Sequence, residues 1–201
     1  MLRPQLSRRT IVRMFPVSLM AFASATCSRL VKPTNSSTAL VPTPACGDDA
    51  ATPSQTEGPF YTPDSPRRQS LLESGLSGTR MIVTGQVLSS TCVPIAGALV
   101  DCWHTNHQGE YDNRGYTFRG HQFTDAEGRY RIETIVPGLY TGRTRHFHIK
   151  VQAPNQPVLT TQLYFPEEPA NQGDFLFNPV LLMAVDDGEE IKKATFDFVL
   201  A

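Results

Sequence analysis

Two histidines one residue apart, His146 and His148, are the first residues in this sequence whose types and spacing could do chemistry. On a β-strand, side chains two residues apart point to the same face. Phe147, Ile149 and Val151 then take the core face, and the two imidazoles point together, as ligands of one metal ion would. The same pattern also fits two half-exposed histidines that hydrogen-bond to neighbouring loops. The pair alone therefore leaves both interpretations open.

The residues beside the histidine pair argue against a site completed by a carboxylate. A cupin-type site would need a glutamate a few residues downstream, where Lys150, Val151 and Gln152 stand. An iron(II) site of two histidines and one carboxylate uses an aspartate or glutamate at close spacing, and the residues next to the pair include neither. Something other than a carboxylate must complete any metal site here.

Tyrosine is the candidate for the missing ligands. Tyr111 lies shortly after the strand expected to end at Trp103, and Tyr140 lies in the turn that leads to the histidine strand. A phenol has a pKa near 10 and is ordinarily neutral. A bound trivalent iron would deprotonate it, and phenolate is a hard anionic donor that favours Fe(III) over Fe(II). Each tyrosine taken singly also fits a packed aromatic residue with a hydrogen-bonded hydroxyl.

Short strands separated by turns must position these residues. No segment sustains a helical period over three turns, and turn-forming residues separate runs that are apolar or that alternate between apolar and polar. This pattern predicts an all-β protein with an antiparallel β-sandwich or barrel-like fold. The expected strands are Met81–Leu88, Ala98–Trp103, Arg129–Ile135, Arg145–Ala153, Val158–Phe165, Val180–Val185 and Ala194–Leu200.

The N-terminal part of the chain is expected to direct export. Paired arginines, Arg8 and Arg9, precede a short apolar run that ends in small residues. This combination predicts a twin-arginine signal peptide over residues 1–25, and the run is too short to span a bilayer. The product is then periplasmic or extracellular. A lipid anchor at Cys27 is the less favoured variant, because the residue before it fits poorly.

Composition divides the rest of the chain into an arm and one domain. Residues 26–52 are rich in Pro, Ser and Thr and read as a linker or irregular arm. Residues 53–201 have the size of one ordinary domain with a single core. The net charge is −1 and no basic stripe is present, so we expect no nucleic-acid partner. We also expect no transmembrane segment in the mature protein, and we leave the number of subunits open, a homo-oligomer included.

The four cysteines form no C-x-x-C pair, so a zinc site made of thiolates is not expected. Export would expose them to oxidising conditions, under which disulfides form. We favour a bridge between Cys46 and Cys92, because one lies in the arm and the other in a turn. Cys102 lies within an apolar strand and is expected to be a buried thiol.

A series of short motifs resembles the intradiol ring-cleavage dioxygenases, the family of catechol 1,2-dioxygenase and protocatechuate 3,4-dioxygenase. The motifs keep the family's order and cover about Pro53 to Phe165. They are Thr56–Tyr61, Pro94–His104, Gly109–Tyr111, Phe118–Gly120, Thr124–Tyr130, Thr134–Tyr140, His146–His148 and Thr161–Phe165. The resemblance implies a β-sandwich enzyme with Fe(III). It would insert O2 between the two hydroxyl-bearing carbons of a catechol-type aromatic and yield a cis,cis-muconate-type diacid.

The resemblance also assigns roles to individual residues. Tyr140 corresponds to the ligand that leaves when substrate binds and that can accept a substrate proton. Arg143 would stabilise negative charge that develops on the ring, and Gln162 matches the family glutamine. The stretch Glu57–Tyr61 corresponds to residues near the mouth of the substrate pocket. The four expected iron ligands are Tyr111, Tyr140, His146 and His148.

Other residues near these motifs receive no catalytic role from the resemblance. Arg145 lies closer to the first histidine than Arg143 but at the wrong offset. His104, His107 and His121 match no ligand position, and we read them as surface residues or as neighbours of the ligands.

The chain departs from the family between Tyr140 and Arg143, and two rival interpretations stay open. Only two residues separate Tyr140 from Arg143, where the protocatechuate enzymes have a longer insertion that shapes the substrate pocket. Recognition of a substrate carboxylate is therefore not expected. One rival is a non-catalytic β-sandwich binding module of the transthyretin-like or adhesion type. The other is a zinc or copper enzyme, although these metals prefer imidazole and thiolate over two phenolates.

Overall fold

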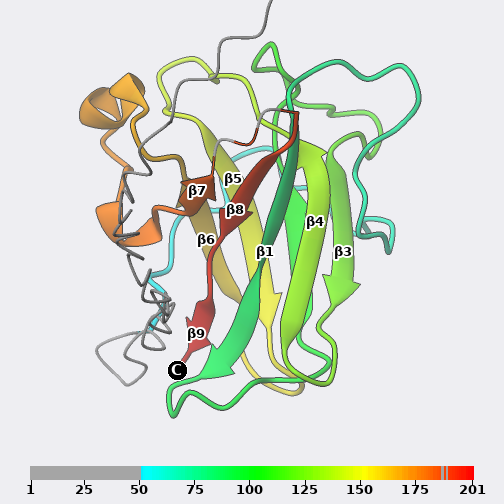
Figure 1. The fold of residues 1–201 in the computed structure, drawn as a ribbon, viewed down its shortest axis with the longest axis vertical. Helices are drawn as coiled ribbons and strands as arrows, with labels where there is room; N and C mark the ends of the chain where they lie inside the picture. Colours follow the sequence, from blue (N-terminus) through cyan, green and yellow to red (C-terminus); the bar gives the residue numbers. More distant parts are fainter. Residues whose placement is uncertain (1–50, 187, 189) are drawn as a thin grey trace, which may run out of the picture. The chain divides into compact units, whose positions relative to one another are not determined.

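The computed structural model describes residues 51–186, 188 and 190–201. Two β-sheets face each other (Figure 1). Apolar side chains from both sheets form one core. The first sheet has the order β4-β1-β8-β7, and β9 also pairs with β1. Its strands are β1 (Arg80–Ser89), β4 (Arg129–Ile135), β7 (Ala184–Asp186), β8 (Lys192–Thr195) and β9 (Phe198–Leu200). The all-β sandwich prediction is confirmed.

The second sheet carries the histidine pair. Its order is β3-β2-β5-β6, and all its pairings are antiparallel. Its strands are β2 (Leu99–Trp103), β3 (Arg119–Phe123), β5 (His146–Gln152) and β6 (Leu159–Tyr164). Two short 3-10 helices, η2 (Pro169–Gly173) and η3 (Pro179–Leu181), follow β6.

Alternation along the strands places the core between the sheets. On β5, Phe147, Ile149 and Val151 are buried in this core, as predicted. The alternation of β4 is also confirmed, because Tyr130 and Ile132 are buried there. The histidines of β5 therefore lie on the opposite, outer face of the second sheet.

The C-terminal part of the first sheet differs from the prediction of one strand over Ala194–Leu200. The structure divides this segment into β8 and β9, and both run parallel to β1. The reason is a close approach at Gly85, where an added Cβ would lie 1.8 Å from the carbonyl oxygen of Phe196. Beside it, Asp197 Oδ1 replaces a strand partner by accepting a hydrogen bond of 2.7 Å from the Gln86 amide.

Two other elements also differ from the predicted strands. The segment Val180–Val185 begins within η3 and becomes a strand only at β7. The strand β3 was not predicted, because its sequence, Arg-Gly-His-Gln-Phe, shows no apolar alternation. It is a strand because it pairs with β2 over five residues.

A segment that we call the strap, residues 53–68, crosses the outer face of the second sheet. At one end, the Gln55 amide donates to the carbonyl of Thr160 on β6 at 2.8 Å. At the other end, the Arg68 amide donates to the carbonyl of His121 on β3, also at 2.8 Å. The strap therefore covers the face on which the histidines lie.

The structure tests only some of the predictions about the N-terminal part of the chain and the cysteines. The signal peptide, most of the expected arm, Cys27 and Cys46 lie outside the described residues. Cys92 has no disulfide partner among the described residues, and the predicted bridge to Cys46 stays a prediction because Cys46 lies outside them. Cys102 is a buried free thiol, as expected. Among the described residues, no helix is long and apolar enough to cross a membrane.

Candidate metal centre

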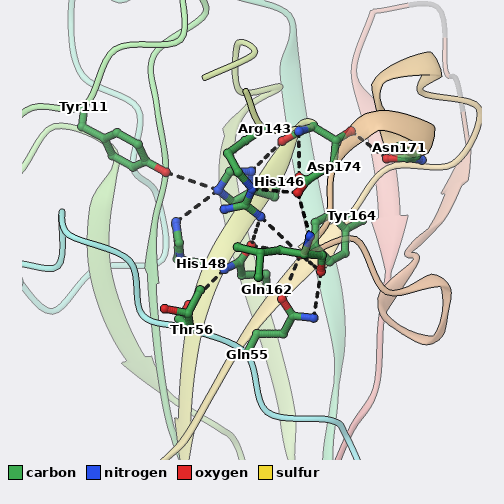
Figure 2. Close-up of polar contacts among 12 residues, drawn as sticks. Gln55, Thr56, Tyr111, Arg143, His146, His148, Gln162, Tyr164, Asn171 and Asp174 are labelled. Atoms are coloured by element: carbon green, nitrogen blue, oxygen red, sulfur yellow. Dashed lines mark hydrogen bonds and ion pairs between the residues drawn. The ribbon is translucent and has the colours of Figure 1, made fainter. Parts of the chain in front are cut away.

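The outer face of the second sheet forms the floor of the candidate site (Figure 2). Residues directly opposite one another on paired strands point to the same side. The strand register therefore places one row of side chains across all four strands. This row consists of Arg119, Trp103, His148 and Gln162.

The two histidines bring one ring nitrogen each to a common point. His146 Nε2 lies 3.1 Å from His148 Nε2. The other nitrogen of His146, Nδ1, lies 2.6 Å from the carbonyl oxygen of Thr144. Because a carbonyl only accepts, Nδ1 carries the proton and Nε2 keeps its lone pair. At least one of the two imidazoles is thus oriented as a ligand of a cation.

Burial keeps both imidazoles neutral. Desolvation lowers the pKa of His146 to about 4, although the hydrogen bond to Thr144 opposes this shift. Desolvation also lowers the pKa of His148 well below its ordinary value, and the neighbouring His146 adds to this effect. Neutral imidazole is the form that binds metals, so the pair is ready to coordinate at neutral pH.

Tyr111 directs its hydroxyl at the histidine pair. Its oxygen lies 3.4 Å from His146 Nε2 (Figure 2). The ring of Phe60 stacks on the ring of Tyr111 at 4.6 Å between centroids. Burial raises the pKa of the phenol, while the positive charges of Arg143 and Arg119 oppose this shift. Without a bound cation the phenol is neutral, so a Lewis acid is needed to hold it as phenolate.

Tyr140 lies beside Tyr111 but on a different loop. The two tyrosine rings lie edge-on with centroids 5.7 Å apart, and Phe60 contacts the second ring at 5.5 Å. Tyr140 is half-buried, in a loop that precedes β5. The strap residue Phe60 thus packs against both candidate phenolates.

Two glycines allow the loops that carry the tyrosines to meet backbone to backbone. An added Cβ at Gly109 would lie 2.0 Å from the carbonyl oxygen of Leu139. An added Cβ at Gly138 would lie 2.3 Å from the amide nitrogen of Gly109. The Gly138 amide donates to the carbonyl of Asn106 at 2.8 Å. This close packing, which only glycine permits, fixes the distance between Tyr111 and Tyr140.

Arg143 is held at the site by Asp174 and Gln162, and its Nη2 also donates to the Tyr164 hydroxyl at 3.4 Å. Its Nε donates to both carboxylate oxygens of Asp174, at 3.0 and 2.9 Å. Its Nη2 donates to Gln162 Oε1 at 2.7 Å. Gln162 in turn donates through Nε2 to the carbonyl of Thr56 in the strap at 2.9 Å. The guanidinium is therefore fixed in orientation before any substrate binds.

Asp174 and Tyr164 belong to this network, and we did not predict either of them. The Thr144 amide donates to Asp174 Oδ2 at 2.9 Å, which ties the carboxylate to the start of the histidine strand. Burial favours protonation of Asp174, but hydrogen bonds and the charge of Arg143 oppose it, so its pKa is lowered. The Tyr164 hydroxyl donates to Gln162 Oε1 at 3.0 Å. Tyr164 belongs to the Thr161–Phe165 motif, so this motif could have indicated it. Asp174 lies in none of the motifs.

The residues without an assigned role lie apart from the converging donors. Arg145 pairs with Glu168 at 3.0 Å and donates to the carbonyl of Pro137, so it supports the loop that carries Tyr140. His104 is not a surface residue, because it is buried between the carbonyl of Thr105 (2.7 Å) and the hydroxyl of Thr134 (2.6 Å). His107 is exposed.

The donor set fits a hard trivalent cation. Among the described residues, no cluster of three His, Cys, Asp or Glu side chains could hold a metal ion. The groups that converge are imidazole nitrogens and phenol oxygens. Phenolate and imidazole together suit Fe(III), whereas a site for a soft or borderline metal would include thiolate ligands.

Comparison with known proteins places this arrangement in a family. A family model described as "Dioxygenase" matches residues 56–201. Catechol 1,2-dioxygenase 2 of Acinetobacter lwoffii is 31% identical over 157 residues, which are 65% of this chain and 57% of that protein. The chain belongs to the intradiol ring-cleavage dioxygenase family. It spans about half the length of the curated family members it matches, for example 57% and 51% of two catechol 1,2-dioxygenases.

Solved structures of intradiol dioxygenases and their relatives share this fold. One is the dioxygenase domain of a dioxygenase carbohydrate-binding protein fusion from the cellulolytic bacterium Streptomyces sp. SirexAA-E. It is 54% identical, has a TM-score of 0.73, and the match covers 75% of this chain and 97% of that one. Another is 3-chlorocatechol 1,2-dioxygenase from Rhodococcus opacus 1CP, which is 26% identical with a TM-score of 0.68, over 74% of this chain and 71% of that one.

Proposed function

We propose that this chain is an Fe(III)-dependent dioxygenase that cleaves a catechol between its two hydroxyl-bearing carbons. The observation that carries the proposal is the position of His146 Nε2, which lies 3.1 Å from His148 Nε2 and 3.4 Å from the Tyr111 hydroxyl. Tyr140 lies beside Tyr111. Ferric iron, when bound, supplies a Lewis acid that holds both catechol oxygens and makes the ring reactive toward O2. His146, His148, Tyr111 and Tyr140 would hold it.

Tyr140 is the residue we assign to proton transfer from the substrate. It lies in the loop between β4 and β5, so its side chain can change position without disturbing either sheet. A phenolate released in this way is a base within reach of a catechol hydroxyl. Tyr111, stacked under Phe60, stays in place.

Arg143 is the residue we assign to charge stabilisation. Its guanidinium is fixed by Asp174 and Gln162, so no reorganisation is needed when negative charge develops on the substrate ring. Gln162 orients Arg143 on one side and holds the strap at Thr56 on the other. These contacts support roles for both residues in the reaction.

We further propose that the substrate is an uncharged catechol met outside the cytoplasm. The short Tyr140–Arg143 connection lacks the insertion that shapes the pocket of protocatechuate enzymes. The paired arginines at the N-terminus favour export by the twin-arginine route, to the periplasm or beyond. A 54% identical domain is part of a fusion with a carbohydrate-binding protein in a cellulolytic bacterium. Catechols released from plant or humic polymers fit these three observations.

Metal loading of the purified protein tests the proposal. Ferric iron should give a red-brown protein through tyrosinate-to-iron(III) charge transfer, and an added catechol should shift this colour. A protein that stays colourless after ferric loading would instead support a non-catalytic binding module. Stoichiometric zinc or copper bound in preference to iron would support the other rival.

A further inference from the structure

We infer that packing between Trp103 and Gly58, and not a hydrogen bond, holds His148 in its metal-binding orientation. The two are positioning residues for one ligand of the iron site. This inference rests on the proposed function, because it concerns how the protein presents His148 Nε2 to a metal.

The two histidines differ in what fixes their rings. His146 donates through Nδ1 to the Thr144 carbonyl at 2.6 Å. His148 Nδ1 is buried and has no hydrogen-bond partner among the described residues. A metal-binding histidine ordinarily donates its other ring N–H to a carboxylate, a carbonyl or water, and this bond sets the ring orientation. None of the described residues accepts such a bond from His148, so packing contacts are the ones in the protein that orient its ring.

Trp103 provides a contact against one face of the His148 ring. The two residues are direct neighbours across β2 and β5. Their rings are nearly parallel, with centroids 4.9 Å apart and an interplanar angle of 6°. The indole is itself fixed, because Trp103 is buried and its ring packs against that of Tyr61 in the strap, with centroids 4.9 Å apart. A rotation of the imidazole about χ2 would break this stack.

Gly58 provides the contact at the metal-facing edge of the same ring. A Cβ at this position would lie 3.2 Å from His148 Cε1 and 3.7 Å from Nε2, the ligand atom. The backbone of Gly58 also has φ +72°, a conformation that glycine adopts without strain. The strap thus reaches the imidazole with backbone alone and leaves room for a metal at Nε2.

The strap cannot easily retreat from His148, because it is fastened on both sides of Gly58. Glu57 forms an ion pair with Lys150, the next residue on the same face of β5. The Phe60 carbonyl accepts from Arg119 Nη1 at 2.7 Å. A side chain added at Gly58 would therefore displace the imidazole by a few tenths of an ångström before it displaced the strap.

Gly58→Ala tests this inference against a matched control. Gly97 has nearly the same φ, +69°, but an added Cβ there meets nothing within 4 Å. Gly97→Ala therefore carries the same backbone strain without a contact to His148. We expect Gly58→Ala to weaken ferric binding at least ~10-fold and to shift the charge-transfer band. We expect Gly97→Ala to match the wild type in both, while the two metal-free variants lose similar thermal stability.

Substitutions of Trp103 test the other contact. Trp103→Phe keeps an aromatic face against His148 and should retain iron with a modest spectral shift. Trp103→Leu removes the stack and should bind ferric iron about 10-fold more weakly than Trp103→Phe does. The inference is overturned if Gly58→Ala binds iron with the affinity and spectrum of Gly97→Ala. A wild-type protein that binds no ferric iron would refute the proposed function instead.

Discussion

The two tyrosines are held differently, so the same substitution should affect them differently. The ring of Tyr111 is stacked by Phe60 and its oxygen lies 3.4 Å from His146 Nε2, whereas Tyr140 meets Phe60 edge-on. Tyr111→Phe should abolish both iron binding and colour, because it removes the ligand that stays. Tyr140→Phe should retain part of the iron with an altered band, because it models the ligand that leaves. Iron analysis and visible absorption measure both, and equal losses would contradict the assignment.

Asp174 is expected to matter for turnover more than for metal binding. Its Oδ2 lies 2.9 Å from Arg143 Nε and fixes the guanidinium. Asp174 is not one of the four residues that we expect to bind the metal. Asp174→Asn should lower kcat by about 10- to 100-fold while the iron content stays that of the wild type, since electrostatic groups of this kind contribute on that scale. Steady-state kinetics with matched iron analysis measures the effect.

Glu168 offers the control for this substitution. It forms the same kind of carboxylate–arginine pair with Arg145, away from the converging donors. Glu168→Gln should lower kcat much less than Asp174→Asn, because Arg145 contacts the loop of Tyr140 at the Pro137 carbonyl and does not contact Arg143. If both variants lost activity alike, general damage to the fold would explain the effect better than a misplaced Arg143.

At the scale of the elements, His104 links the two sheets and should make stability depend on pH. Its ring bonds to Thr134 on β4 at 2.6 Å, and burial lowers its pKa to about 3. The unfolded chain binds this proton near pH 6.5, so the unfolding free energy should fall as pH drops from about 6.5 toward 3. His104 contributes at most about 1.4 kcal/mol per pH unit to this slope.

His104→Gln should therefore show a shallower pH dependence than the wild type in urea unfolding between pH 7 and 4. The exposed His107 provides the matched control, and His107→Gln should keep the wild-type slope. If His104→Gln had the same dependence of unfolding free energy on pH as the wild type, His104 would be protonated in the folded state.

The strands β1, β2, β4, β5 and β6 could be predicted from the sequence because their signals are local, whereas the full set of four candidate ligands came from the family resemblance. Alternation placed His146 and His148 on one face, and the glycines beside Tyr111 and Tyr140 belong to recognisable motifs. Asp174 could not be predicted, since its partners Arg143 and Thr144 lie about thirty residues away. The split of the last strand depends on Gly85, which is more than a hundred residues from Phe196. Such long-range contacts leave no periodic pattern.

At the scale of the whole molecule, export is the prediction that the described residues leave untested. The paired arginines and the apolar run after them predict that residues 1–25 are removed on the way out of the cytoplasm. Replacing Arg8 and Arg9 together by lysine should keep the protein inside, whereas Arg13→Lys should not. Fractionation of cells and the mass of the mature protein measure this, and an uncleaved cytoplasmic chain would contradict it.

The central claim concerns the reaction, and one measurement addresses it directly. Purified, ferric-loaded protein is given catechol under ¹⁸O2, and the product is analysed by mass spectrometry. The account predicts a ring-opened cis,cis-muconate-type diacid that carries ¹⁸O from molecular oxygen. Intact catechol after full iron loading, or a product cleaved next to the hydroxyl-bearing carbons instead of between them, would contradict it.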